Sequence, residues 1–265
     1  MLEGYKTPMI SISVVSHEQA DLVGALLQDL VKIAEETPIE VLLTKNLPEK
    51  TPDVFFPSNC ILRVIENREA QGFGHNHNAA FAAAKGDFFC VLNPDIRLSA
   101  NPFPVLLNTL ADHLNAIAVP QILGPEGHVQ DSVRHFPTLW RLIKRVSRLE
   151  ADHIVPSAGA TLIPVDWAAG MFLLMRSKQY AALGGFDQRY FLYCEDVDLS
   201  ARVWKSGKRV VLCTQAIAIH DARRTSHGNF KYLTWHLTSY VRYFIRHSLR
   251  PPRAARARVE AELGQ

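Results

Sequence analysis

Short apolar runs alternate with a helical pattern in the first hundred residues. Runs typical of buried strands lie at 9–15, 39–43, 61–65 and 88–92. After the first run, one helical face is marked by apolar residues three or four positions apart: Leu22, Val23, Leu26, Leu27, Leu30 and Val31. A proline-rich loop is expected at 48–57, and a second helix at 79–84 with Gly86 as its C-cap. This alternation predicts an α/β domain.

The pattern is less regular after residue 95. A helix is expected from Phe103 to Leu114, followed by an irregular, polar and basic segment at 129–163. The elements expected next are a strand within 166–175, a helix ending at Gly184-Gly185, an acidic helix stopped by Gly207, and two strands at 209–213 and 216–219. The last of these strands would place His220 at its end.

Composition fits one large domain, or a domain with an appendage. A chain of 265 residues that is 48% hydrophobic can bury a full core. No apolar run approaches the roughly 18 to 20 residues of a membrane span, and no basic segment precedes an apolar one at the N-terminus, so we expect a cytoplasmic protein. The cysteines lack CxxC spacing and are predicted to be buried thiols rather than disulfides or zinc ligands: Cys60, Cys90, Cys194 and Cys213.

The net charge of +3 conceals an uneven distribution. Residues 222–259 contain nine Lys or Arg and no acid, which leaves a net negative charge on the rest of the chain. Nucleic-acid binding is not predicted, because no nucleic-acid-binding motif accompanies the basic residues. The segment 230–246 mixes aromatic and basic residues, as a helix at a membrane interface would. A helix packed on the domain with its arginines in water would show the same pattern.

Acidic residues occur at two positions that suit a cleft. Glu195, Asp196 and Asp198 open a predicted helix, where the helix dipole tolerates negative charge. Apolar neighbours there can raise the pKa of a carboxylate towards that of a general base, although a capped amphipathic helix would look similar. The second element, Asn93-Pro94-Asp95, ends the apolar run at 88–92. Open parallel sheets bind ligands outside the carboxyl ends of their strands, so these acids indicate a binding cleft.

A set of motifs in a fixed order resembles family 2 glycosyltransferases of GT-A fold. The motifs are Ser16-His17, Gly72-Phe73 through Asn78, Gly86-Asp87, Asn93-Pro94-Asp95, Gly170-Met171-Phe172, Gly184-Gly185-Phe186-Asp187, Glu195-Asp196-Val197-Asp198-Leu199 and His220. The set is most similar to the rhamnosyltransferase-like branch, in which the strand-end acid is written Asn-Pro-Asp, and it covers roughly Met9 to Ser226. The resemblance implies a GT-A domain at 1–228 with a Rossmann-like nucleotide-sugar-binding half (1–98) on a mostly parallel mixed sheet and an acceptor-binding, catalytic half (99–228). A basic amphipathic helical extension would follow at 229–265.

The activity that this resemblance implies is inverting, metal-dependent sugar transfer. The donor would be a dTDP- or UDP-sugar, foremost dTDP-rhamnose, and the acceptor a lipid-linked glycan or an oligosaccharide for a bacterial surface polysaccharide such as lipopolysaccharide. Peripheral contact with the inner face of the plasma membrane and a homodimer are both compatible with it. A non-catalytic sugar-nucleotide-binding or scaffold protein on the same fold is the alternative. A nucleotidyltransferase is less favoured, because the chain lacks a basic glycine-rich phosphate loop near its N-terminus.

The resemblance also assigns roles to residues. Mg²⁺ or Mn²⁺ would be anchored by Asp95, with His220 as a further ligand or a purely structural residue. Asp196 is expected to be the general base, with Glu195 as the alternative, because sequence does not show which side chain faces the cleft. Asp198 would contribute to the electrostatics of its own helix or support neighbouring donors. Donor recognition is expected from residues at strand ends and helix starts: Ser16, His17, Glu18, Asn46, Gly72, Asn78 and Asn93.

Two positions depart from the pattern of the family. Relatives usually carry Thr-Tyr-Asn after the first strand and an Asp-Asn pair after the second, where this chain has Val15-Ser16-His17 and Lys45-Asn46. Lys45 would therefore reverse a charge in the donor pocket. This residue is the one feature of the sequence that favours the non-catalytic alternative.

Overall fold

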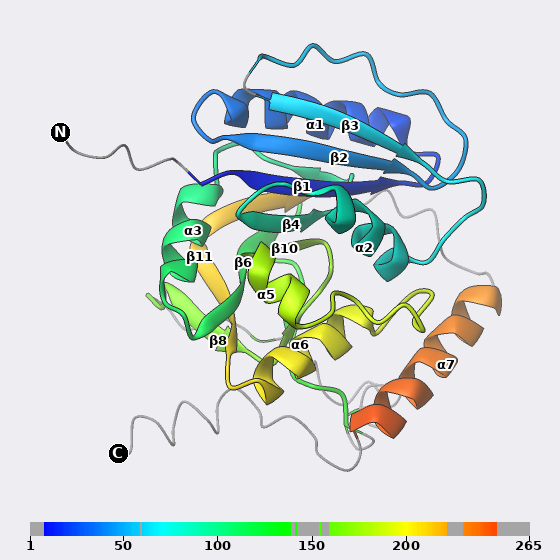
Figure 1. Ribbon diagram of the computed structural model, residues 1–265. Coiled ribbons are helices and arrows are strands. Elements are labelled where there is room, and N and C mark those ends of the chain that lie inside the picture. The colour runs from blue at the N-terminus through cyan, green and yellow to red at the C-terminus, as the bar shows by residue number, and fades with distance from the viewer. Residues whose placement is uncertain are drawn as a thin grey trace.

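The computed structural model describes residues 8–58, 60–138, 141, 154, 159–221 and 230–247. Its centre is a nine-stranded sheet with helices on both faces (Figure 1). The strands are β1 (Ile10–Ser16), β2 (Ile39–Lys45), β3 (Cys60–Glu66), β4 (Phe88–Leu92), β5 (Ile96–Arg97), β6 (Asn115–Leu123), β8 (Leu162–Val165), β10 (Phe172–Arg176) and β11 (Arg209–His220). Their order is β3-β2-β1-β4-β10-β6-β11-β5, and β8 pairs with β11.

The sheet is mixed, as predicted. Strands β3, β2, β1 and β4 are parallel neighbours, and they all lie within the predicted nucleotide-sugar-binding half, residues 1–98. Strand β10 runs antiparallel between β4 and β6, while β6 and β11 are parallel. The short strands β5 and β8 are antiparallel to β11. A separate two-stranded sheet joins β7 (Val133–Arg134) to β9 (Trp167–Ala168).

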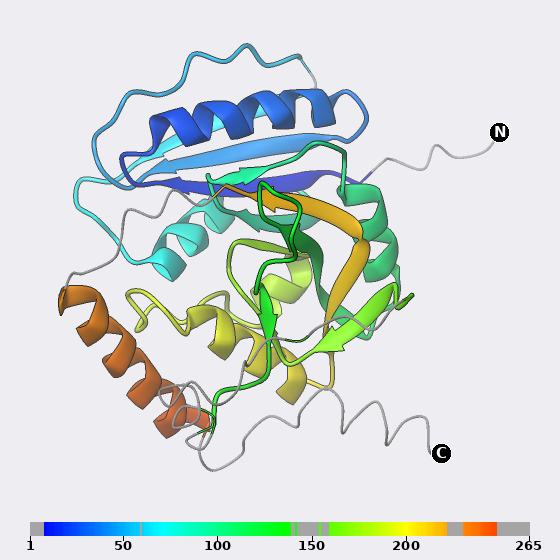
Figure 2. The same cartoon turned by 180° about the vertical axis from the view of Figure 1, so that it is seen from behind.

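Helices cover both faces of the sheet because its strands are apolar on both sides. The helices are α1 (Ala20–Ala34), α2 (Phe73–Ala83), α3 (Phe103–Ala111), α5 (Ser177–Ala182), α6 (Glu195–Lys205) and α7 (Phe230–His247). One hydrophobic core joins α1 and α3 to Ile10, Ile12 and Val14 of β1. A second core joins α2, α5, α6 and α7 to the opposite face (Figure 2).

The second helix differs from its prediction at both ends. It begins at Phe73 rather than residue 79, because the buried side chains of Asn76 and His77 make tertiary contacts that outweigh their low helix propensity. The C-cap is Ala84, not Gly86. A Cβ on Gly86 would lie 2.6 Å from the backbone nitrogen of Ser11, so this glycine permits a close chain approach instead of capping the helix.

The sequence pattern also missed one strand and divided another. Strand β6 was not predicted, and it contains Pro120, which is unusual inside a sheet because proline has no N–H to donate. The two strands expected at 209–213 and 216–219 are one strand, β11. Its register against β6 shifts between Cys213 and Ile217, directly after the Cys213–Pro120 pair. The bulge thus lies where β6 lacks a donor, and it explains the break in the sequence pattern.

Other boundaries moved by a few residues. The helix expected to reach Leu114 ends at Ala111, and the strand expected within 166–175 is divided between β9 and β10. All four cysteines are buried free thiols, as predicted. Much of the segment 129–163 lies outside the described residues. None of the described helices has the length and apolar character needed to cross a membrane.

The basic, aromatic segment at 230–246 forms α7, which packs on the domain by one face. Ser239, Tyr243 and His247 are buried on that face. The opposite face is solvent-exposed, and in both ribbon views α7 lies at the outside of the molecule beside α6 (Figures 1 and 2). Both interpretations of this segment therefore remain compatible with its position, because packing occupies only the inner face.

Candidate active site

A cavity of about 530 Å³ lies at the carboxyl ends of β1, β2 and β4. Four of the residues predicted to bind donor or metal line it, namely His17, Asn46, Asn93 and Asp95. The other lining residues are Val15, Gln19, Leu47, Ala70, Gln71, Phe73, Asn76, Pro94, Phe191, Leu192 and Trp235. Phe191 and Leu192 come from the loop before α6, and Trp235 comes from α7. Segments far apart in the sequence therefore close the cavity.

Amide side chains fix one wall of this cavity. The Asn46 carboxamide oxygen accepts hydrogen bonds from the Asn67 side chain (2.9 Å) and the Gln71 backbone N–H (2.8 Å). Its nitrogen donates to the Gln71 carbonyl and to Nδ1 of His17. Asn67 also donates to Asn76 at 2.7 Å. Because its amide group is saturated by protein contacts, Asn46 shapes the wall and positions His17.

Four residues predicted to bind the donor do not line the cavity: Ser16, Glu18, Gly72 and Asn78. Ser16 is buried, and its hydroxyl accepts a hydrogen bond from the Gln19 backbone N–H at the start of α1. Glu18 is exposed and has a φ of 59°. Asn78 holds the loop at Phe186, since its oxygen accepts from the Phe186 N–H and its nitrogen donates to the Phe186 carbonyl. The structure therefore does not bring these side chains to the cavity.

Gly72 contributes through its small size. A Cβ at this position would lie 2.6 Å from the Phe191 carbonyl oxygen, which accepts a hydrogen bond from the N–H of Phe73. Any side chain at residue 72 would therefore push apart two segments that both line the cavity.

Lys45 lies at the end of β2 without lining the cavity. Its ammonium is 2.8 Å from a carboxylate oxygen of Glu66, the paired residue at the end of β3. The expected charge reversal in the donor pocket is therefore not seen, because the positive charge is paired with the neighbouring strand.

Asp95 and His220 face one another although 125 positions separate them in sequence. Nε2 of His220 is 3.1 Å from Oδ2 of Asp95. Nδ1 of His220 is 2.6 Å from Oε1 of Gln130, whose amide nitrogen donates to the His220 carbonyl and so fixes the orientation of the amide. Since Oε1 can only accept, Nδ1 carries a proton. The contact between Nε2 and Asp95 is then a hydrogen bond when Nε2 is also protonated, and a bound metal ion would take the place of that proton.

This pair fits a divalent cation. Oδ1 of Asp95 is buried and has no hydrogen-bond partner. A carboxylate oxygen, an imidazole lone pair, and a hydrogen bond that fixes the far side of the ring are features of metal sites in proteins. Among the described residues no group of three or more His, Cys, Asp and Glu could hold a metal. Remaining ligands would have to be phosphate oxygens and water.

The two candidate bases differ in environment at the start of α6. Glu195 is buried, with one carboxylate oxygen that has no partner. Asp196 is partly exposed, and its oxygens accept hydrogen bonds from the backbone N–H groups of Gly170 (3.0 Å) and Val197 (2.8 Å). Gly170 in turn lies against the ring of Phe73, a lining residue of the cavity. Neither carboxylate lines the cavity itself, but Asp196 is the more accessible of the two and reaches the cavity wall through Gly170 and Phe73.

Burial raises the pKa of both carboxyl groups. For Glu195 the pKa lies well above its ordinary value because of desolvation and the neighbouring charge of Asp196. For Asp196 desolvation also raises the pKa, while the two backbone hydrogen bonds and Arg134 oppose the shift. The ionised form of Asp196 is therefore better stabilised than that of Glu195, which tends to remain protonated.

The turn before these acids is conformationally unusual. Tyr193 and Cys194 both have positive φ, at 73° and 65°, although neither is glycine. Such left-handed residues require support from their surroundings. Helix α7 supplies it, because the ring of His236 stacks on Tyr193 at 3.5 Å and the Ser239 hydroxyl donates to the Leu192 carbonyl. Trp235 packs on Phe191 with 4.7 Å between ring centroids.

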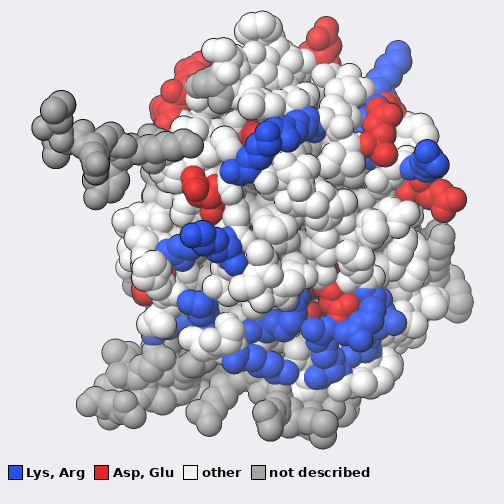
Figure 3. Space-filling model, in the orientation of Figure 1, with Lys and Arg blue, Asp and Glu red and all other residues white. Residues whose placement is uncertain are grey.

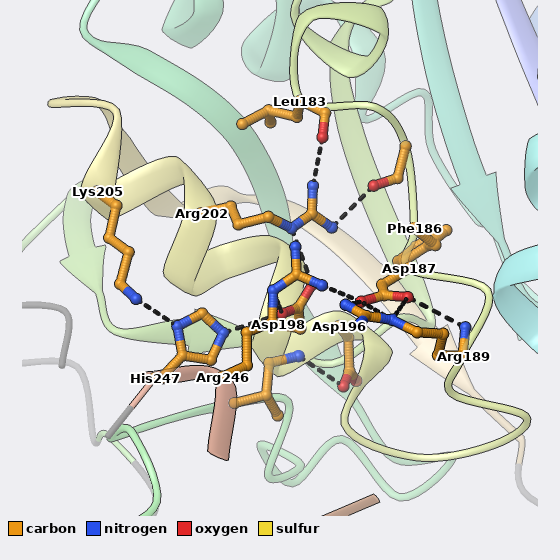
Figure 4. A network of polar contacts seen from close by, with 12 residues as sticks. Leu183, Phe186, Asp187, Arg189, Asp196, Asp198, Arg202, Lys205, Arg246 and His247 are labelled. Atoms are coloured by element: carbon orange, nitrogen blue, oxygen red, sulfur yellow. Dashed lines mark hydrogen bonds and ion pairs between the residues drawn. The ribbon is translucent and has the colours of Figure 1, made fainter. Parts of the chain in front are cut away.

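Helix α7 is anchored through the buried carboxylate of Asp198 (Figure 4). Arg202 donates to Asp198 at 2.8 Å, Arg246 lies 3.1 Å from it, and Nε2 of His247 lies at 2.9 Å. Because the Lys205 ammonium can only donate to Nδ1 of His247, Nε2 of that neutral ring carries the proton and donates to Asp198. This arrangement ties the end of α7 to α6.

The cluster around Asp198 also contacts the turn at Gly184-Gly185, which precedes the loop 191–194. Arg202 donates to the carbonyl oxygens of Leu183 and Gly185, and Arg246 also pairs with Asp187 (Figure 4). Asp198 was expected to contribute to the electrostatics of its own helix or to support neighbouring donors. Asp198 also binds Arg246 and His247 of α7. Sequence spacing could not reveal this connection.

Several residues of the site were absent from the sequence-based prediction. Gln130 and Asn67 act through partners that only the fold brings near, and no local motif marks them. Asn76 lies within the motif from Gly72 to Asn78, but no role was assigned to it. Trp235 was expected at a membrane interface rather than in the cavity wall. Its aromatic neighbours in α7 were a visible signal, but they did not show which residues face the domain.

Comparisons with known proteins agree with this geometry. The family model described as glycosyl transferase family 2 matches residues 11–164. Rhamnosyltransferase WbbL of Escherichia coli K12 is 30% identical over 255 residues, covering 90% of this chain and 93% of that protein. An N-acetylglucosaminyl-diphospho-decaprenol L-rhamnosyltransferase of Mycobacterium tuberculosis H37Rv is 29% identical over 250 residues, covering 82% of this chain and 78% of that protein.

Solved structures resemble the chain in fold. GalNAc-T7 with UDP, GalNAc and Mn²⁺ has a TM-score of 0.67 at 16% identity, covering 91% of this chain and 48% of that one. The mannosyltransferase PcManGT of Pyrobaculum calidifontis with GDP-Man and Mn²⁺ has a TM-score of 0.61 at 14% identity, covering 94% and 66%. The chain thus spans about half of the first structure and about two thirds of the second. The shared fold is GT-A.

Asp198→Ala should lower the free energy of unfolding by about 3 kcal/mol, because Arg202 and Arg246 would lose the carboxylate that compensates their partial burial. Chemical denaturation of both proteins measures the difference. Glu126→Ala is the control, since its pair with His128 is exposed on both sides and should contribute less than about 1 kcal/mol. Similar losses in the two variants would contradict an anchoring role for Asp198.

Glu195 should make stability depend on pH. Its folded-state pKa is raised above the unfolded value of about 4.3, so its stabilising contribution is complete below that value and is lost as pH rises through the folded-state pKa. Glu195→Gln should therefore flatten the decline of unfolding free energy above about pH 5, as measured by urea denaturation at several pH values. Glu35→Gln, an exposed position, should leave the slope unchanged. An unaltered slope in Glu195→Gln would show that Glu195 is not buried as a neutral acid.

Proposed function

The chain belongs to glycosyl transferase family 2 and is a glycosyltransferase of GT-A fold, and we propose that it transfers rhamnose from dTDP-rhamnose with inversion. Two relatives named as rhamnosyltransferases support this choice of sugar. The observation that carries the proposal is the cavity at the sheet edge, which has the Asp95–His220 pair on one side and the start of α6 beside it. Its volume of about 530 Å³ is within the range of small-molecule sites.

The proposed cofactor is Mg²⁺ or Mn²⁺, held by Asp95 and His220. The unpartnered oxygen of Asp95 and the imidazole nitrogen 3.1 Å from its other oxygen support it, and two structures of the same fold contain Mn²⁺. Bound there, the ion would neutralise negative charge on the diphosphate leaving group. Gln130 keeps the imidazole in the tautomer that a metal ligand requires.

Asp196 is the proposed general base. Its partly exposed carboxylate would accept the proton of the acceptor hydroxyl as that oxygen attacks the anomeric carbon from the side opposite the leaving group. Such in-line attack inverts the configuration at that carbon. The N–H groups of Gly170 and Val197 hold the carboxylate in place. Glu195, buried and inclined to keep its proton, would support the turn instead.

The proposed acceptor is a lipid-linked glycan, with an oligosaccharide as the alternative, in synthesis of a bacterial surface polysaccharide. The mycobacterial relative supports it, because its name specifies a sugar linked through a diphosphate to decaprenol. We place the protein in the cytoplasm, in peripheral contact with the inner face of the plasma membrane. Lys45 no longer favours a non-catalytic protein, since Glu66 pairs it outside the cavity.

Binding of sugar nucleotides tests the donor and the metal together. Isothermal titration with dTDP-rhamnose, UDP-N-acetylglucosamine and GDP-mannose, each with and without Mn²⁺, should show tightest binding for dTDP-rhamnose in the presence of the ion. Asp95→Ala should abolish the effect of Mn²⁺ on donor binding while the protein stays folded. Asp53→Ala, an exposed acid in the loop before β3, is the control and should behave like wild type. A Mn²⁺ effect that survives in Asp95→Ala would overturn the metal assignment.

Asp196→Asn keeps the shape of the side chain but removes the proton acceptor, so turnover should fall by about 10² to 10⁴. Donor affinity should change little, and Glu195→Gln should keep more activity than Asp196→Asn. Steady-state kinetics measures both, and NMR of the product reports the anomeric configuration. Because the pKa of Asp196 is raised, wild-type turnover should increase with pH over a higher range than an ordinary carboxylate would give. An active Asp196→Asn with an inactive Glu195→Gln would exchange the two roles.

A further inference from the structure

The outer face of α7 carries a line of large aliphatic side chains. Leu237, Val241 and Ile245 follow one another at intervals of four residues and are 59%, 58% and 73% exposed. Residues four apart lie on the same side of a helix, so the three form one apolar stripe. The buried residues of α7 point the other way, so the stripe faces solvent.

Basic residues are frequent in α7 and in the neighbouring α6 region. Arg242 and Arg246 belong to α7, and Arg189, Arg202 and Lys205 come from α6 and the loop before it. The carboxylates of Asp187 and Asp198 pair with several of these cations. Five basic side chains therefore share two acids. Figure 3 shows the resulting group of Lys and Arg over the lower part of the face that carries α6 and α7.

We propose that this outer face of α7 is a docking surface for an anionic lipid bilayer. The inference rests on the proposed lipid-linked acceptor. Aliphatic side chains at the stripe would enter the boundary between headgroups and acyl chains, while the arginines beside them would meet lipid phosphates. A helix with a charged flank, an apolar stripe and no acidic residue has the composition of such interfacial helices.

Charge argues against a second copy of the chain as the occupant. Pairing two α7 helices about a two-fold axis would bring the arginines of both copies together, and α7 contains no acid to compensate them. From Leu237 to Ile245 the stripe is only about 12 Å long. This is short for an interface that must bury about 800 Å² on each partner.

The stripe is continuous with a wall of the donor cavity. Trp235 lines the cavity and packs on Phe191, and the stripe starts at Leu237, about 3 Å further along the helix axis. One rigid element thus carries both the proposed membrane surface and part of the cavity. Docking by the stripe would bring the cavity close to sugars that project from lipid carriers in the same bilayer.

Vesicle sedimentation of the full chain tests the proposal. The protein should bind vesicles that contain phosphatidylglycerol, bind phosphatidylcholine vesicles much less, and be released by high salt. The triple variant Leu237→Gln, Val241→Gln, Ile245→Gln should lose about 100-fold or more in partition coefficient, because burying one such side chain is worth about tenfold or more. Arg242→Glu should lose about 25-fold on the anionic vesicles alone.

A matched triple variant serves as the control. Ile61→Gln, Val129→Gln and Leu162→Gln replace aliphatic residues that are 49%, 53% and 49% exposed elsewhere on the surface. This variant should bind vesicles like wild type. Equal loss in both triple variants, equal binding of wild type to both vesicle types, or no binding at all would overturn the proposal. It would also be overturned by a wild-type dimer in analytical ultracentrifugation that the α7 triple variant dissociates.

A second readout separates this surface from the proposed activity. With a short-chain, water-soluble acceptor, the α7 triple variant should turn over at the wild-type rate, whereas transfer to a long-chain acceptor in anionic vesicles should fall in parallel with binding. Equal rates of the variant and wild type on the vesicle-borne acceptor would contradict the docking surface. If wild type binds anionic vesicles through the stripe but transfers sugar to neither acceptor, the surface stands and the proposed function fails.

Discussion

A carboxylate can remain charged inside a protein only where cations and hydrogen-bond donors replace water, and Asp198 gathers them from two helices, α6 and α7. Its partner Arg202 also binds the carbonyls of the glycine turn, and its partners on α7 fix the C-terminal helix. The position of α7 then determines where Trp235 and Ser239 meet the loop before α6. The cavity wall and the left-handed turn beside the candidate base both depend on this one buried charge.

Helix α6 serves two environments because its first acids point in different directions. Residues two positions apart lie about 200° apart around a helix, so Asp196 and Asp198 face nearly opposite sides. Asp196 meets Gly170 next to the cavity wall, while Asp198 faces the cations of α7. A short acidic sequence can thus provide a reactive group and a structural anchor without competition between them.

The sequence was sufficient to predict the elements that have a clear local pattern and the site residues that lie at strand ends. The four parallel strands, α1 and the acidic start of α6 followed from periodicity, and the resemblance brought Asp95 and His220 together before their contact was seen. It could not reveal β6, because Pro120 is tolerated only through a bulge in its neighbour. Likewise, Asn78 was predicted to bind the donor. Its actual hydrogen bonds to Phe186 could not be foreseen, because the two residues are more than a hundred positions apart in the sequence. Contacts of that kind depend on the assembled fold.

The late position of α7 in the chain has a consequence for biosynthesis. A polypeptide emerges from the ribosome N-terminus first, so every strand of the sheet is available before Trp235 and His247 are made. Until then the loop at Tyr193 and Cys194 lacks the stacking and hydrogen bonds that support its left-handed backbone. A nascent chain would therefore hold an open, incompletely formed cavity, and competence for ligand would arise only once α7 has been made and has packed.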